Sequence, residues 1–278
     1  MNFESAKSQF ISNANGPTYF GEAEFGFGKI QSELNALKPG ANVLEVGAGA
    51  GILMAMNASI HKDLNFTGVE PMGDGFDYDN VFHRLINTIP NAEIQPVGYE
   101  DLKTSIKYDL IYLVNVFEHL PDWKDFLQFV SGTLTENGRC IILCPNYSFP
   151  YEPHFQIPII FNKPLTHFLL KKRITKFETE NDCKGLWTSL NFCKFRSVSK
   201  NAAQAGFNVS NDKSTFTEMI DRLETDEEFA KRQGLLRLPI SVLNKLGLIS
   251  LFVKSRMFNM VSPYMHLVLT NSGDSGTA

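Results

Sequence analysis

The sequence predicts an α/β fold: a Rossmann-like, seven-stranded, mostly parallel sheet with helices on both faces. Short apolar segments of strand character alternate with helical segments from residue 39 to residue 150, which is typical of parallel sheets with right-handed crossovers. Two of these segments, YDLIYLVNVF (108–117) and RCIILCP (139–145), are almost continuously apolar, as expected for strands buried on both faces. A glycine-rich turn, GAGAG (47–51), connects the first strand to a helix.

The elements follow one another in a simple order. Residues 1–28 are rich in Gly and Phe and predict irregular structure, and a helix at 29–38 ends at Pro39-Gly40. Hydrophobic periodicity predicts further helices at 52–59, 76–89, 122–134 and 197–206. Apolar runs predict strands at 41–46, 65–70, 93–98, 108–117, 139–145, 207–210 and 263–270.

The chain of 278 residues predicts a single domain spanning 1–278. Within it we expect an N-terminal lid and helix (1–38), a cofactor-binding core (39–150) and a disordered polar tail (271–278). Two less regular segments, 146–196 and 211–260, are expected to be insertions that cover the substrate. Both combine aromatic or apolar residues with basic ones.

Composition excludes several function classes. The formal net charge of −4 argues against a general nucleic-acid binder. The chain has no signal-peptide pattern and no run of about 20 apolar residues, so a cytoplasmic protein is expected. The four cysteines form no CxxC pair, which predicts reduced thiols and no zinc site.

The glycine-rich turn predicts a cofactor site. A strand, a glycine turn and a helix N-terminus together present backbone amides to a bound nucleotide. The spacing here is G-x-G-x-G, with Ile52 where the dinucleotide fingerprint has its third glycine. Glu70 ends the second strand, where a carboxylate can accept hydrogen bonds from both ribose hydroxyls.

The ordered set Glu45, GAGAG, Glu70, VGYEDL (97–102) and EHLPD (118–122) resembles the class I S-adenosylmethionine-dependent methyltransferases. The similarity is to the large group that acts on small molecules, and it covers about residues 40–150. The Gly98-Tyr99 pair departs from the Gly-Asp or Gly-Ser start of the corresponding loop in that family.

The resemblance implies a set of cofactor contacts by position. The methionine part of S-adenosylmethionine would lie against Glu45 and the turn residues Gly47, Ala48, Gly49 and Gly51. The ribose would lie against Glu70 and Pro71, the adenine against Tyr99, Glu100 or Asp101, the sulfonium above Asn115 and Val116, and the cofactor carboxylate near Tyr19 of an N-terminal lid (GPTYF, 16–20).

Two histidines are candidates for catalysis. His119 follows the fourth strand, at the edge where open α/β sheets bind ligands, and either packs beneath the cofactor loop or acts on the acceptor. His154 follows the fifth strand with Tyr151 and Glu152, as a substrate contact or base, or as part of an ordered surface loop. Glu118 and Asp122 do not reproduce the acidic set of catechol-type O-methyltransferases, so no metal is expected.

The function expected from these features is methylation of a small-molecule or lipid-linked acceptor, at oxygen. The alternatives are a non-catalytic methyltransferase-like binding protein and an NAD(P)-dependent oxidoreductase, which the glycine spacing disfavours. Residues 229–260 contain no acid and alternate apolar clusters with single cations. They form either a helical lid or a peripheral contact with the inner face of an anionic membrane.

Overall fold

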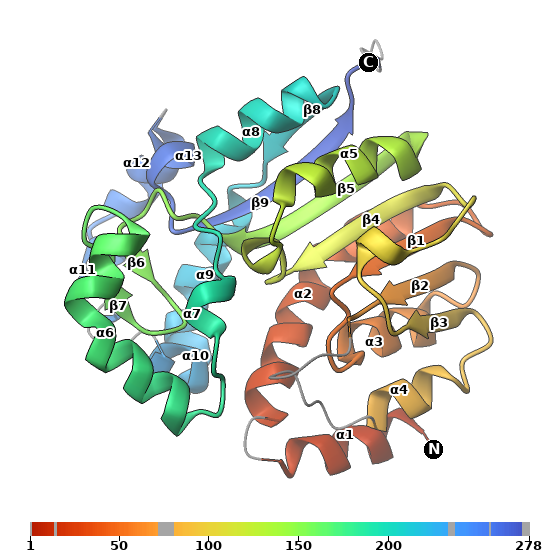
Figure 1. Cartoon of the computed structure of the whole chain (residues 1–278), viewed down its shortest axis with the longest axis horizontal. Coiled ribbons are helices and arrows are strands. Elements are labelled where there is room, and N and C mark those ends of the chain that lie inside the picture. Colours follow the sequence, from red (N-terminus) through yellow and green to blue (C-terminus); the bar gives the residue numbers. More distant parts are fainter. Residues whose placement is uncertain (1, 14–15, 72–80, 233–236, 256, 274–278) are drawn as a thin grey trace.

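Seven strands form one sheet in the part of the chain that the computed structural model describes, residues 2–13, 16–71, 81–232, 237–255 and 257–273 (Figure 1). The strand order is β3-β2-β1-β4-β5-β9-β8, and only β9 runs antiparallel to its neighbours. This confirms the predicted fold class. The strands are β1 (Asn42–Val46), β2 (Asn65–Val69), β3 (Ala92–Gln95), β4 (Tyr108–Val114), β5 (Leu134–Pro145), β8 (Phe207–Asn211) and β9 (Tyr264–Asn271).

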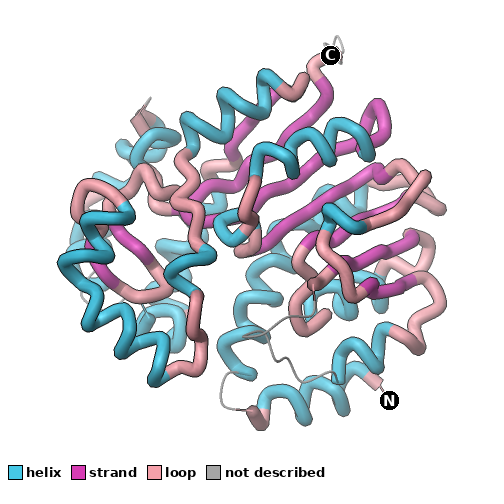
Figure 2. The backbone as a smooth tube through the Cα atoms, viewed as in Figure 1, coloured by secondary structure: helices cyan, strands magenta, loops and turns pink. Residues whose placement is uncertain are grey.

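Helices cover both faces of this sheet (Figure 2). Successive residues of β4 alternate between the two cores: Ile111 and Leu113 pack on one side, Leu110 and Tyr112 on the other. This explains why the strand is apolar at nearly every position. The first core includes α5 (Trp123–Thr133) and α8 (Phe195–Gln204), and the second includes α1 (Phe3–Ile11), α2 (Gly16–Ala36), α3 (Ile52–Ile60) and α4 (Val81–Ile86).

The prediction of irregular structure over residues 1–28 is wrong, because α1 and α2 occupy most of this segment. The glycines of α2 misled the prediction. Gly26 packs so closely on the core that an added Cβ would lie 3.1 Å from the side chains of Leu53 and Val114. A residue that usually weakens helices therefore serves here as a contact surface.

The two insertions contain more regular structure than their sequences indicate. Residues 146–196 form a short hairpin of β6 (Tyr151–Glu152) and β7 (Ile157–Pro158), a long helix α6 (Lys163–Glu180) and a short α7 (Leu186–Ser189). Asn162 caps α6 by accepting a hydrogen bond from the Leu165 amide, and Pro164 lies in the first turn, a typical helix start.

The second insertion is helical and has a small core of its own. Its helices are α9 (Ser214–Thr225), α10 (Glu227–Arg232), α11 (Arg237–Lys245), α12 (Leu248–Lys254) and α13 (Phe258–Val261). No described helix is both long and apolar enough to cross a membrane. The end of the tail, 274–278, lies outside the described residues.

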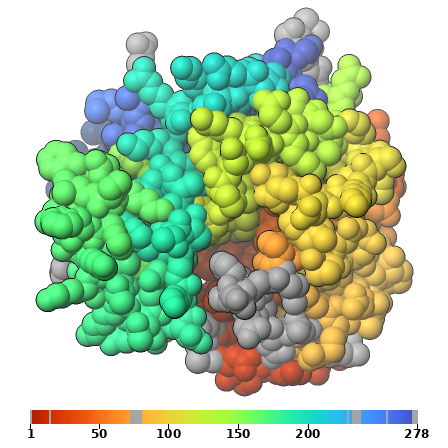
Figure 3. Space-filling view, in the orientation of Figure 1, coloured from red at the N-terminus to blue at the C-terminus, as the bar shows by residue number. Residues whose placement is uncertain are grey.

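The strands direct their carboxyl ends toward the first insertion. In Figure 1 the arrowheads of β2, β3 and β4 point toward the part of the molecule that contains β6, β7, α6 and α7. Figure 3 shows a hollow between that insertion, drawn in green, and the orange and yellow residues of the core. Sites in open α/β sheets lie at this edge.

A chain of buried polar groups crosses the core from β1 to α2. Tyr112 donates a hydrogen bond to Glu45 (2.7 Å), and Asn57 of α3 donates one to the Tyr112 hydroxyl (3.2 Å). Asn57 in turn accepts from Gln31 of α2 (2.9 Å). Burial raises the pKa of Glu45 to about 8, with Glu70 adding to the rise and the Tyr112 bond opposing it.

Replacing Glu45 with glutamine should flatten the pH dependence of stability. A folded-state pKa above the ordinary value of 4.5 means that the folded protein holds the Glu45 proton more tightly. This contribution is complete below the unfolded pKa and is lost as pH rises through about 8. Urea unfolding at about pH 5 and about pH 8.5 should show wild type losing more free energy of unfolding than E45Q. Glu93→Gln, on an exposed strand position, is the control; equal losses in E45Q and wild type would contradict a protonated Glu45.

Candidate functional site

The site begins at the glycine turn between β1 and α3. Gly47, Gly49 and Gly51 all have positive φ, +72°, +53° and +80°, a backbone region that favours glycine. The Gly47 and Ala48 amides donate to the Val69 carbonyl at the end of β2 (2.9 and 3.1 Å). The turn is therefore bound to β2 as well as to β1.

Glu70 joins this turn directly. Its Oε2 accepts a hydrogen bond from the Gly49 amide at 2.9 Å. The residue is 8% exposed, and burial raises the pKa of its carboxyl although the Gly49 hydrogen bond opposes this. A carboxylate held beside left-handed backbone fits the ribose of a nucleoside cofactor. Pro71 follows as an exposed residue, and residues 72–80 lie outside the described part of the chain.

The end of β4 packs against the same turn. A Cβ added to Gly47 would lie 2.4 Å from Cγ2 of Val116, so only glycine allows this approach. Asn115, with φ +55°, donates to Glu22 of α2 (2.9 Å) and accepts from the Tyr264 hydroxyl (2.7 Å). Asn115 thus links the end of β4 to α2 and β9.

The remaining cofactor candidates lie in different surroundings. Tyr99 is 4% exposed, packs on Phe126 and donates a hydrogen bond to the Asp122 carbonyl (3.2 Å). This burial gives no support to the prediction that its side chain borders an adenine, which stays a prediction, whereas Glu100 is exposed on the η1 turn (Tyr99–Asp101). The Glu45 carboxyl is 5% exposed and bonded to Tyr112 within the core.

Tyr19 lies on α2 with 43% of its surface exposed. Its ring is 6.5 Å from that of Phe10. Partial burial raises the pKa of the Tyr19 hydroxyl, and Cys183 of the first insertion adds to the rise. The residue therefore lies between the N-terminal helices and that insertion, and its proposed contact with a cofactor carboxylate stays a prediction.

The two candidate histidines meet. His119 ends the η2 turn (Phe117–His119) after β4, and His154 lies in the loop between β6 and β7. Their rings are 5.3 Å apart, and one ligand atom each of Glu118, His119 and His154 lies within 4.8 Å of the others. We call these three residues the Glu-His-His cluster.

Hydrogen bonds fix the tautomers of both rings. The Ser189 hydroxyl donates to the Leu186 carbonyl (2.8 Å), so His119 Nδ1 must be the donor in its 2.9 Å bond to Ser189. His154 Nδ1 lies 2.6 Å from Glu152 Oε1. In a neutral ring each Nε2 then carries the lone pair.

Glu152 positions His154 from inside the protein. The residue is fully buried and also accepts hydrogen bonds from the Phe155 amide (2.7 Å) and the Tyr147 hydroxyl (3.2 Å). Its described partners all belong to the protein, and its predicted contact with substrate stays a prediction. Tyr151, its neighbour in β6, is half-buried and remains a candidate substrate contact.

Asn191 is a structural residue of the site that sequence reasoning missed. Its amide nitrogen and side chain donate to the carbonyls of Glu118 (2.7 Å), Phe117 (2.7 Å) and Leu120 (3.1 Å). These hydrogen bonds attach the η2 turn to the first insertion. An isolated asparagine in an irregular segment gives no sequence signal for such a role.

Burial sets the protonation of the cluster. It raises the pKa of Glu118 to about 7, with His154 opposing the rise. It lowers the pKa of His119 to about 3, helped by the His154 charge. Burial also disfavours charge on His154, but its hydrogen bond to Glu152 and the carboxylates around it outweigh that effect and raise its pKa.

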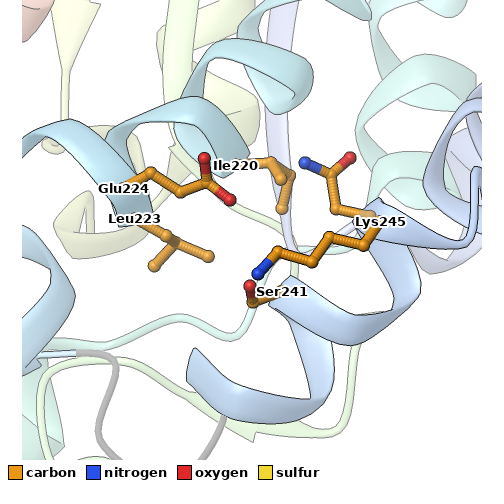
Figure 4. Close-up of a pocket in the computed structure, with 6 residues that line it drawn as sticks. Ile220, Leu223, Glu224, Ser241 and Lys245 are labelled. Carbon is orange, nitrogen blue, oxygen red and sulfur yellow. The ribbon is translucent and has the colours of Figure 1, made fainter.

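A separate pocket lies in the second insertion. It has a volume of about 320 Å³ between α9 and α11 and is lined by Ile220, Leu223, Glu224, Ser241, Asn244 and Lys245 (Figure 4). None of these residues belongs to the strand ends or to the Glu-His-His cluster. Ser241, Asn244 and Lys245 lie within the 229–260 stretch expected to form a lid or a membrane contact, but the sequence did not predict a pocket there.

The sequence matches a family of known proteins over most of its length. A family profile described as "Methyltransferase domain" matches residues 23–210. An uncharacterized protein of Mycobacterium tuberculosis (strain ATCC 25618 / H37Rv) is 33% identical over 216 residues, which are 77% of this chain and 73% of that protein.

Solved structures share the fold. Haemonchus contortus phosphoethanolamine N-methyltransferase 2, in complex with S-adenosyl-L-methionine, aligns with a TM-score of 0.53 at 14% identity over 97% of this chain and 59% of that chain. The plantazolicin methyltransferase BpumL, in complex with a substrate analog and S-adenosylhomocysteine, aligns with a TM-score of 0.51 at 12% identity over 96% and 90%.

Replacing Gly47 with alanine should destabilise the protein more than the same change at Gly40. Both glycines have positive φ, but only at Gly47 would the new Cβ meet other atoms. We expect about 1 kcal/mol of loss for G40A from backbone strain, and a further 1–3 kcal/mol or so for G47A from overpacking. Urea unfolding measures both losses. In G47A/V116A part of the loss should be recovered; equal losses for G40A and G47A would show that Val116 does not constrain the turn.

Proposed function

This chain belongs to the methyltransferase domain family, and on that basis we propose that it methylates a hydroxyl oxygen of a small-molecule or lipid-linked acceptor. The cofactor of the family is S-adenosylmethionine, which supplies an activated methyl group on a sulfonium. The observation that carries the proposal is the Glu-His-His cluster. Two of its members, Glu118 and His119, follow the end of β4 shortly after Val116, the residue that packs on the glycine turn.

The glycine turn and Glu70 would hold the cofactor. The Gly47–Gly51 backbone presents no side chain larger than a methyl group, and Glu70 is oriented by the Gly49 amide. Because the methyl group is already activated, the main task of the protein is to align the acceptor for in-line displacement and to exclude water. Asn115 and Val116 would form the floor of that space.

The cluster supports oxygen as the nucleophile. A hydroxyl is a weak nucleophile until its proton is removed, whereas a neutral amine already carries a free lone pair. In the proposed step the acceptor oxygen bonds to the methyl carbon, the carbon–sulfur bond breaks with its electron pair going to sulfur, and the hydroxyl proton passes to Nε2 of His154. His119 and His154 are the catalytic residues we propose for activating that hydroxyl.

The second insertion supports a contact with an anionic membrane surface at the inner face of the bilayer. From residue 229 to residue 270 the chain has no acidic residue. Exposed apolar side chains include Leu238 (77%) on α11, Leu251 (66%) on α12 and Leu246 (67%) between the two helices. Such a surface with neighbouring lysines is typical of interfacial helices, and it would bring a lipid-linked acceptor to a cytoplasmic enzyme.

Glu70→Gln should weaken the binding of S-adenosylhomocysteine by about tenfold or more, since a hydrogen bond to a charged carboxylate contributes about 1.5–3 kcal/mol. Calorimetric titration of the purified chain would measure this, with NADH as the competing cofactor and Glu93→Gln as the matched control. Wild type should bind S-adenosylhomocysteine and not NADH.

The same proteins should then be assayed for transfer of a labelled methyl group from S-adenosylmethionine to a panel of hydroxylated and amine acceptors. Oxygen methylation by wild type, reduced in E70Q, is the expected result. Affinity that E70Q leaves unchanged would contradict the cofactor site, and methylation only at nitrogen would contradict the acceptor assignment.

Replacing Leu238 and Leu251 together with glutamate should release the protein from anionic vesicles. Burial of each leucine in a bilayer is worth about 1.5–3 kcal/mol, so we expect at least a tenfold loss of partitioning in vesicle sedimentation. Ile106 is an exposed apolar side chain in the cofactor-binding part of the chain, outside the second insertion. Ile106→Glu should leave partitioning unchanged. Wild type that fails to sediment with anionic vesicles would exclude the membrane contact and leave these helices as a lid.

A further inference from the structure

The Glu-His-His cluster has the composition and geometry of a metal site. Its members come from two segments, η2 and the β6–β7 loop, and their ligand atoms lie within 4.8 Å of one another. We propose that Glu118, His119 and His154 bind a divalent transition-metal cation. The sequence predicted no metal because it does not show that the β6–β7 loop brings His154 onto the residues after β4.

Glu118 gives the first independent support. Its side chain is fully buried, and neither carboxylate oxygen has a hydrogen-bond partner among the described residues. A buried polar group without a partner costs free energy, and a charged one costs much more. A cation bound to this carboxylate would remove that cost.

The hydrogen bonds that the two histidines make through Nδ1 give the second independent support. Metal-bound imidazoles usually donate their other N–H to a carboxylate or another acceptor, which fixes the tautomer and the ring orientation. His154 Nδ1 bonds to buried Glu152, and His119 Nδ1 donates to Ser189. Because both Nδ1 atoms are engaged in this way, Nε2 is the nitrogen that each ring has left for a cation.

The surrounding charge also favours a cation. The groups that act electrostatically on Glu118 include two further carboxylates, Glu152 and Glu22, against the single cationic candidate His154. Glu22 is held nearby by its hydrogen bond from Asn115 (2.9 Å).

The donor set selects the class of metal. Two imidazoles with one carboxylate suit Zn²⁺, Mn²⁺ or Fe²⁺, whereas Mg²⁺ and Ca²⁺ prefer oxygen ligands alone. Three protein ligands leave coordination positions open. Given the proposed function, on which this step rests, an acceptor hydroxyl would occupy one of them, lose its proton to water at lower pH and attack the methyl carbon. The histidines would then act by holding the cation.

Metal binding can be tested without any acceptor. The full chain, freed of metal with a chelator, would be titrated calorimetrically with Zn²⁺, Mn²⁺ and Mg²⁺, and Mn²⁺ binding would be followed by electron paramagnetic resonance. We expect the chain to bind one equivalent of Zn²⁺ or Mn²⁺ and to bind Mg²⁺ much more weakly. Glu118→Gln and His154→Ala should each lower affinity by more than 100-fold or so, and Glu152→Gln by about tenfold.

His167→Ala is the matched control, since His167 stacks on Trp187 outside the cluster and its loss should leave metal affinity unchanged. S-adenosylhomocysteine titration without metal shows that each variant is folded and tests the cofactor site separately. Absence of stoichiometric binding by wild type, or binding that E118Q and H154A both retain, would overturn the metal site. A metal-binding chain that fails to bind S-adenosylhomocysteine would instead contradict the proposed function alone.

Discussion

The close approach of Gly47 to Val116 is the constraint on which the site depends. Because residue 47 has no side chain, the end of β4 can pack directly on the turn after β1. That contact fixes the positions of Asn115, Glu118 and His119 relative to the glycine backbone. Any side chain at residue 47 would move the β4 end away and separate the two halves of the site, the half that would hold a nucleoside and the half that carries titratable groups.

The parts of the fold that depend on local pattern were predictable. The seven strands and their class follow from apolar runs with helical segments between them, since burial on both faces leaves a strong signal in each strand. The turn Gly47–Gly51 and Glu70 were also predictable, because the backbone conformation requires glycine and the end of a strand fixes where a carboxylate lies. The structure adds a contact that the sequence did not predict, the hydrogen bond from the Gly49 amide to Glu70.

The parts that depend on long-range packing were not. The glycines of α2 suggested irregular structure, and the surface that Gly26 contacts, on α3 and β4, lies elsewhere in the chain. Tyr99 and Glu152 were assigned to ligands because polar groups near a site are visible in a sequence, whereas their burial against Phe126 and beside Tyr147 is not. Asn191 shows the same limit, since its partners are backbone carbonyls that no pattern reveals.

The two halves of the Glu-His-His cluster have different origins, and this has a consequence for how the site works. Glu118 and His119 belong to the core, directly after β4, whereas His154, Glu152, Ser189 and Asn191 all come from the first insertion. The core supplies Glu118 and His119 but cannot complete the cluster without His154. If the cluster acts on an acceptor as proposed, that chemistry would depend on the position of the first insertion, which carries His154 and covers the strand ends, where it would also exclude water.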